Sequence, residues 1–562
     1  MSEFDMVIRG GTVADGTGGA LFEGDVGVAG GRIAAVGKGL GRGAEEIDAR
    51  GLLVTPGFVD IHTHYDGQVT WEHTLAPSSD HGVTTVVMGN CGVGFAPCRP
   101  EDRSALITLM EGVEDLPEAV LSAGIPWEWE DFAGYLDFLE SRSYDIDIAA
   151  QVPHAPVRVY AMGERAFDRE PSTEAENAAM ARIVADAIRA GALGFSTSRS
   201  LNHKGSDGRV SPSLQAAEAE LTAIATALGQ TGTGVLQGIL DPADAVAEME
   251  MFGRVCRAAG RPMSLSVMQR HSHPEAWREV MAIMDKFNAE GMTVRGQVSE
   301  RPVGALYGLD LSFNPLAKAM HYASIADLPL PQRVKALAEP SLRARILAEM
   351  EPFAQDMHFD RMFSLGNPPD YEPGPDRFIA ARARAQGVSA LEMLYDLMLE
   401  DEGRAIIAHP ASNYAYGSLE ACREMMLHPH TVMGLGDGGA HLGILCDASQ
   451  PTHLLSYWTR DRASGRIPVE TAVSALSRET AAAVGLNDRG TIARGKRADI
   501  NVIDYDKLAF DSPTATYDLP QGGRRLGQRS RGYAASLVAG TAIVRNDAHT
   551  GARPGRLVRG AR

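Results

Sequence analysis

The chain has 562 residues, of which 44% are hydrophobic, 22% are charged and five are cysteine, and its formal net charge is −19. This charge disfavours partners such as nucleic acid or an anionic membrane surface, and no apolar run approaches the ~20 residues that span a bilayer. The few cysteines favour a reducing compartment, and the acidic N-terminus lacks a signal-peptide pattern. We expect a cytoplasmic enzyme with a small-molecule substrate, either monomeric or a homo-oligomer.

Short strands separated by glycine turns are predicted at both ends of the chain. In the first 58 residues they fall at 6–9, 25–28 and 32–36, and after residue 490 at 497–503 and 535–544. Neither end has enough strands to bury a face. We therefore predict that residues 1–58 and 491–562 fold together into one small β-sandwich. The rest of the chain lies between these two segments in the sequence.

Between residues 59 and 490, strand-like runs alternate with helical patterns, and this alternation predicts a parallel sheet with crossover helices. A clear helix begins at the capping box of Thr173 and Glu176 and ends at Gly191. The sequence contains nine candidate strands, whereas a (β/α)8 barrel has eight. We expect the run that begins at Ala405 to lie outside the closed sheet.

The longest departure from this alternation lies at about 300–400, where prolines are frequent. They predict irregular backbone. A long insertion near a barrel mouth often acts as a lid, and this is our expectation for it.

Four metal-ligand side chains stand where predicted strands end. His62 and His64 share one face of a strand, because successive side chains alternate. Cys91 lies in a glycine-flanked turn that would expose its thiol, and Asp437 follows a later strand. Barrel enzymes place catalytic residues at such strand ends, and these side chains are of the types that hold a divalent metal. The alternative for Asp437 is that it only closes a strand beside glycine.

The same motifs resemble those of the amidohydrolase superfamily, and the cysteine narrows the resemblance to its N-acyl-D-amino-acid deacylase (D-aminoacylase) branch. The motifs are residues 55–64, the Asn90-Cys91-Gly92 turn, the Gly436-Asp437-Gly438 strand end and residues 488–499. The resemblance implies a distorted TIM barrel with a β-sandwich built from both termini, and zinc-dependent hydrolysis of an amide. It implies His62, His64 and Cys91 as metal ligands, with Asp437 as ligand and general base.

Two strand ends depart from that branch, whose fifth and sixth strands each supply a histidine ligand. Here these positions read Gln237 and Gln269, and Gln269 also takes the place of the lysine that helps to hold the substrate carboxylate. His271 and His273, just beyond the sixth strand, offer a replacement ligand. The departure favours one zinc ion over two.

Four protein ligands would make a closed zinc site of structural type, whereas a catalytic site keeps a place for water. We therefore expect Asp437 to be loosely bound, so that it can take a proton from metal-activated water and pass it to the leaving amine. The weaker candidates for substrate contact are His154 and Arg158 after the third predicted strand, Arg199 and Lys204 after the fourth, and His441, which lies four residues past Asp437.

Three functions remain open at this level. The first is a metal-dependent hydrolase of the amide C–N bond of an N-acyl amino acid or a related small amide. The second is a one-metal hydrolase of another bond, such as a lactone, an ester or a cyclic amide, and Gln237 and Gln269 motivate it. The third is a non-catalytic barrel used for binding or assembly.

Overall fold

The computed structural model describes residues 2–214, 216–241 and 243–561. Strands from both ends of the chain lie in one nine-stranded sheet, in which β5 (Leu53–Pro56) pairs antiparallel with β18 (Ile500–Ile503). Side chains of this sheet form a buried apolar cluster that includes Ile8, Val28, Ile500 and Leu537. The other strands are β1 (Phe4–Val13), β2 (Phe22–Ala29), β3 (Arg32–Gly37), β4 (Gly43–Asp48), β23 (Tyr533–Val538), β24 (Thr541–Arg545) and β25 (Ala548–His549). The domain boundaries at residues 58 and 490 stay predictions.

The middle of the chain contains two parallel sheets. One has the order β6-β7-β8 and the other β17-β13-β12-β11-β10-β9. Only Gln151 separates β8 from β9, and an isolated parallel bridge joins Thr63, beyond β6, to Gly438, beyond β17. The strands are β6 (Phe58–Asp60), β7 (Val83–Met88), β8 (Asp147–Ala150), β9 (Val152–Pro153), β10 (Gly194–Ser198), β11 (Val235–Ile239), β12 (Met263–Ser266), β13 (Val294–Val298) and β17 (Thr431–Met433). The predicted α/β class is confirmed.

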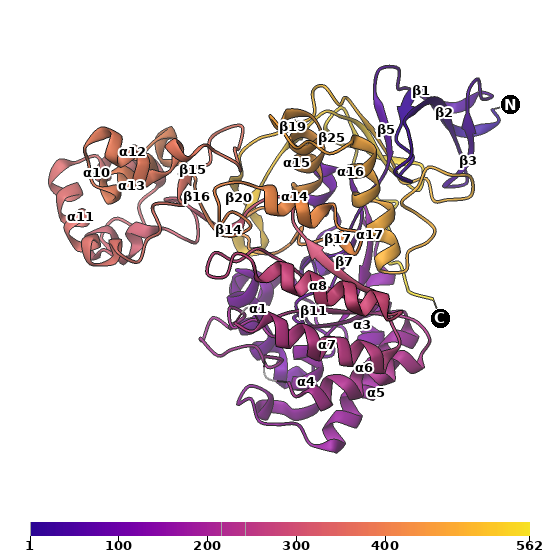
Figure 1. Ribbon diagram of the computed structural model, residues 1–562, viewed down its shortest axis with the longest axis horizontal. Coiled ribbons are helices and arrows are strands. Elements are labelled where there is room, and N and C mark those ends of the chain that lie inside the picture. Colours follow the sequence, from indigo (N-terminus) through magenta and orange to yellow (C-terminus); the bar gives the residue numbers. More distant parts are fainter. Residues whose placement is uncertain (1, 215, 242, 562) are drawn as a thin grey trace.

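Helices connect the successive parallel strands. α5 (Glu174–Ala190) begins at the predicted capping box of Thr173 and ends at Gly191, which adopts a positive φ. It is followed by α6 (Glu218–Gln230), α7 (Ala245–Ala259) and α8 (Ala276–Ala289), and each packs against the next (Figure 1). β7, β8, β10 and β11 are buried at every residue, as is typical of parallel strands covered on both faces.

A helical lobe interrupts the alternation and projects from the rest of the molecule (Figure 1). At its base, β14 (Val303–Tyr307), β16 (Ile407–Ser412) and β15 (Phe363–Ser364) form a separate antiparallel sheet, so the prediction for the run at Ala405 is confirmed. The lobe encloses its own apolar cluster. Its helices are α9 (Met320–Ala323), α10 (Leu330–Leu337), α11 (Pro340–Ala354), α12 (Ile379–Gln386) and α13 (Ala390–Met398).

The prediction of irregular backbone at 300–400 is wrong for much of this lobe. Pro315, Pro331 and Pro340 occupy the first turns of helices. Proline is favoured there, because its missing N–H would have no partner within the helix. No helix in the described residues is long and apolar enough to cross a membrane.

Candidate metal centre

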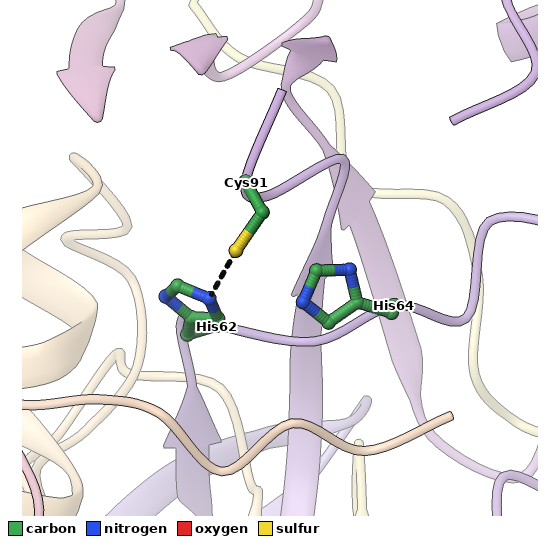
Figure 2. Close-up of side chains that lie close together, drawn as sticks. All are labelled: His62, His64 and Cys91. Atoms are coloured by element: carbon green, nitrogen blue, oxygen red, sulfur yellow. Dashed lines mark hydrogen bonds between the residues drawn. The ribbon is translucent and has the colours of Figure 1, made fainter. Parts of the chain in front are cut away.

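His62, His64 and Cys91 converge beyond the ends of β6 and β7. One ligand atom from each lies within 4.8 Å of the other two. His62 Nε2 is 3.3 Å from Cys91 Sγ, and the two imidazole rings meet at 61° with their centroids 5.5 Å apart (Figure 2). All three side chains are buried. Within the described part of the chain, no other group of three such residues is close enough to hold a metal.

Local hydrogen bonds hold these side chains in place. The Asp60 carboxylate accepts from His62 N at 3.1 Å, and the Thr63 hydroxyl donates to Val87 O at 2.9 Å. Asn90 Nδ2 donates to the carbonyls of Thr63 and Val87. Cys91 adopts φ of 53°, a left-handed conformation that is uncommon for any residue other than glycine. The turn was expected to expose the thiol, and this is wrong: the turn directs it inward, and Cys91 is only 7% exposed.

Asp437 faces both imidazoles from the β17 side. Its Oδ1 is 3.5 Å from His62 Nε2 and 3.7 Å from His64 Nε2, and its backbone N donates to His62 O at 2.9 Å. Its side chain is 14% exposed, so it is the most exposed of the four predicted ligands. Its φ of 46° is also left-handed. Four residues from distant parts of the chain are therefore brought together, as the strand-end pattern predicts. Their role as ligands stays a prediction.

The electrostatics of the cluster favour a bound cation. Burial raises the pKa of Asp437 to about 7, and that of Asp60 and of Asp66 likewise to about 7. Burial, with Glu114 and Asp437 nearby, raises the pKa of the Cys91 thiol well above its usual value. Burial lowers the pKa of His62 to about 4, which keeps the ring neutral as metal binding requires. A divalent cation would stabilise the thiolate and the carboxylates at once, so this donor set fits zinc.

One glutamine that sequence reasoning missed sets the orientation of His62. Gln297, in β13, places Oε1 2.7 Å from His62 Nδ1, while its Nε2 donates to Ser264 Oγ at 2.8 Å. Since Gln297 Oε1 can only accept, His62 carries its hydrogen on Nδ1 and presents a bare Nε2 to Cys91 and Asp437. The sequence shows only a glutamine within a predicted strand, so nothing in it marks this contact.

The two glutamines on β11 and beyond β12 differ from each other. Gln237 is 2% exposed, and neither Oε1 nor Nε2 has a hydrogen-bond partner among the described residues. Gln269 is 1% exposed, but its Oε1 accepts from Ala415 N at 3.1 Å and its backbone N donates to Asn413 Oδ1 at 2.9 Å. Gln269 is therefore held by a loop, whereas Gln237 is a buried amide without partners.

The weaker candidates for substrate contact are dispersed. His154 and Arg158 are buried and share the Glu220 carboxylate, at 2.9 and 3.0 Å, so neither presents free surface to a ligand. Arg199 is bonded to Glu248 at 2.8 Å, and Lys204 is exposed. Substrate contact by these residues stays a prediction.

Three further histidines were considered from the sequence, and only one of them is near the cluster. His441 lies beside it, with Nε2 3.7 Å from Glu114 Oε2. His271 contacts Arg361 and His273 is exposed, and neither joins the metal cluster.

Comparison with known proteins is consistent with this geometry. A model of the amidohydrolase family matches residues 45–544, and the chain belongs to this family. An N-acyl-D-glutamate deacylase of Alcaligenes xylosoxydans xylosoxydans is 28% identical, with 99% of this chain and 97% of that protein covered. A D-aminoacylase of the same organism is 26% identical with the same coverage. The predicted D-aminoacylase resemblance is confirmed.

Solved structures show the same fold. A crystal structure of D-aminoacylase, described as defining a novel subset of amidohydrolases, aligns with a TM-score of 0.66 at 25% identity over 99% of this chain and 100% of that chain. An N-acyl-D-glutamate deacylase from Bordetella bronchiseptica, solved with zinc and a phosphonate inhibitor, aligns with a TM-score of 0.66 at 24% identity and the same coverage.

Proposed function

We propose that this protein is a zinc-dependent hydrolase that cleaves the amide C–N bond of an N-acyl amino acid or a related small amide. The observation that carries the proposal is the buried convergence of His62, His64 and Cys91 with Asp437 facing the two imidazoles. Family membership and the deacylase relatives support it. Cytoplasmic location and oligomeric state stay predictions.

The proposal includes a closed eight-stranded barrel. β8 and β9, interrupted only at Gln151, would make one strand shared by the two parallel sheets, and the Thr63–Gly438 bridge would join their other edges. The carboxyl ends of all eight strands would then surround the cluster, where barrel enzymes place their active sites.

Each residue of the cluster has a role in this proposal. His62, His64 and Cys91 would hold zinc, which supplies polarisation of the carbonyl and a water nucleophile near neutral pH. Asp437 is positioned to take a proton from the attacking water and to deliver it to the nitrogen of the leaving amine. Gln297 holds the His62 ring in the tautomer that leaves Nε2 bare.

One ion is favoured over two, because the β11 and β12 side offers Gln237 and Gln269 in place of histidine. A neutral amide is a weaker zinc ligand than an imidazole or a thiolate. A solved D-aminoacylase is described as having a binuclear centre with one-metal activation and second-metal attenuation, so in that protein one ion is enough for activity.

Elemental analysis and a substrate panel test the proposal. We expect about one zinc per chain and release of free amine from N-acyl D- or L-amino acids. Asp437→Asn should retain the metal and lose turnover. Unchanged turnover in this variant, or purified protein without any divalent metal, would contradict the proposal.

The second candidate is hydrolysis of a lactone, an ester or a cyclic amide, and one observation favours the cyclic amide among these. Among the described residues, neither atom of the buried Gln237 carboxamide has a partner, and a cyclic amide presents a donor and an acceptor side by side that match it. Hydrolysis of cyclic amides or lactones, but not of N-acyl amino acids, would select this candidate.

A further inference from the structure

Glu114, the last residue of α1 (Arg103–Glu114), is a buried carboxyl group, and the basic side chains close to it among the described residues are imidazoles. It is 1% exposed, and within the described residues no lysine or arginine pairs with it. A buried charge without a cationic partner is costly, and such a group calls for an explanation. Neither the strand-end pattern nor the resemblance drew attention to this helix.

The Glu114 carboxylate lies between two rings at the metal cluster. Its Oε1 is 3.2 Å from His64 Nδ1, and its Oε2 is 3.7 Å from His441 Nε2. Among the described residues, neither His64 Nδ1 nor Glu114 Oε2 has an aligned hydrogen bond, so these are close contacts between polar atoms and not formed hydrogen bonds. The opposite nitrogen of the first ring, His64 Nε2, faces Asp437 at 3.7 Å.

We propose that Glu114 is a positioning residue of the metal centre: it keeps the hydrogen of His64 on Nδ1, so that Nε2 is bare toward the ion, and it holds His441 at the edge of the site. The proposal rests on the proposed function, because it takes His64 as a ligand. Glu114 would do for His64 what Gln297 does for His62, with a carboxyl group in place of the amide. A carboxylate behind a ligand imidazole makes the ring a stronger donor to the metal.

The end of α1 is anchored well enough to serve this role. Glu114 O accepts from His441 N at 2.6 Å, so the backbones of the helix and of the loop beyond β17 are joined. The next residue, Asp115, has φ of 53°, and its carboxylate accepts from the Ser312 hydroxyl at 2.7 Å and from Gly443 N at 2.8 Å. Glu114 is thus fixed from both sides, and a ligand shell needs such support to hold its geometry.

The measurement that separates positioning from a general structural role is zinc affinity by competition with a chelator. Loss of an outer contact to a ligand histidine typically weakens metal binding by about 10–100-fold. We expect such a loss in Glu114→Ala, and a smaller loss in Glu114→Gln, whose amide oxygen can take the place of the carboxyl oxygen that faces His64 Nδ1. The matched control is Glu111→Gln, which removes one charge from the same helix at a residue whose carboxylate only accepts from Glu118 N. This control should bind zinc as the unmodified chain does.

The outcomes are distinguishable. Zinc affinity in both Glu114 variants within about threefold of the unmodified chain, well below the expected 10–100-fold, would overturn this inference and leave the proposed function intact. Unmodified protein that binds no zinc would overturn both. Thermal unfolding of the metal-free proteins checks the fold, and if Glu114→Ala does not fold, the nearly isosteric Glu114→Gln decides the question.

Discussion

The two sides of the proposed active site differ in what their buried polar groups touch. On the β6, β7 and β17 side, His62, His64, Cys91 and Asp437 face one another, and Gln297 and Glu114 support the imidazoles from behind. On the β11 and β12 side, Gln237 has no hydrogen-bond partner among the described residues and Gln269 is bonded to a loop. In the proposed function, the first side would hold the zinc ion. The second side, where glutamines replace histidines, would then decide whether a second ion binds.

Removal of the sulfur ligand should have the largest effect. Cys91→Ala takes the only anionic soft ligand from the cluster, so we expect zinc affinity to fall by well over the ~100-fold that loss of an outer contact costs, and activity to fall with it. Cys98→Ala is the control, because Cys98 is also buried but does not belong to the cluster. Full zinc content in Cys91→Ala would show that zinc binding at the cluster does not depend on the Cys91 thiolate.

Asp437→Asn should lower kcat by roughly 100–10,000-fold, the usual contribution of a general base. The amide cannot take a proton from the attacking water, but the three buried ligands remain. Steady-state kinetics together with elemental analysis test this point. Loss of zinc in step with activity would instead make Asp437 primarily a ligand.

Substituting histidine for each of the two glutamines tests whether Gln237 and Gln269 differ in their capacity to bind a second ion. Gln237→His supplies an imidazole where the amide has no partner to lose, so we expect the metal content to rise from about one ion toward about two at high zinc concentration. Gln269→His is the paired variant. It breaks the contact with Ala415 N before it can ligate, and its metal content should not change. Equal metal content in the two variants would contradict the distinction between the glutamines.

The pH dependence of the free energy of unfolding should reflect the raised pKa values of the carboxyl groups around the metal cluster. Burial raises the pKa of Asp60, Asp66 and Asp437 to about 7 from a usual 3.8. A raised pKa means that the folded state binds the proton more tightly than the unfolded state, so metal-free stability should fall as the pH rises from about 4 through about 7. Zinc offsets these charges. The rise in Tm on adding zinc should therefore be larger at about pH 8 than at about pH 6, by about 2–5 °C. A Tm rise that is independent of pH would contradict this account.

The smallest expected effect is that of Gln297→Leu. The side chain keeps a similar volume but cannot accept from His62 Nδ1, so the ring can turn or change tautomer. We expect zinc affinity to fall by about 10-fold, at the low end for such outer contacts. Chelator competition measures it. An unchanged affinity would mean that the backbone around Asp60 orients His62 without this contact.

Some of these features are visible in the sequence because they are local. Alternating strand and helix patterns indicate the α/β class, and His62, His64, Cys91 and Asp437 each follow an apolar run that ends in a turn. Parallel strands carry their carboxyl ends to one face, so residues at strand ends meet even when they are hundreds of positions apart. The capping box at Thr173 is likewise complete within a few residues.

Only the tertiary structure decided which side chains contact the outer nitrogens of the predicted histidine ligands. Glu114 ends an ordinary amphipathic helix and Gln297 lies inside a strand, and each acquires its contact through a partner far away in the chain. The same holds for the difference between Gln237 and Gln269, which depends on whether a loop near Ala415 reaches the amide. In the lobe, prolines begin helices instead of interrupting them, and the lobe encloses its own apolar cluster. Sequence periodicity predicts which face of a helix or strand is buried, but it does not predict which polar atom of a distant segment will contact that face.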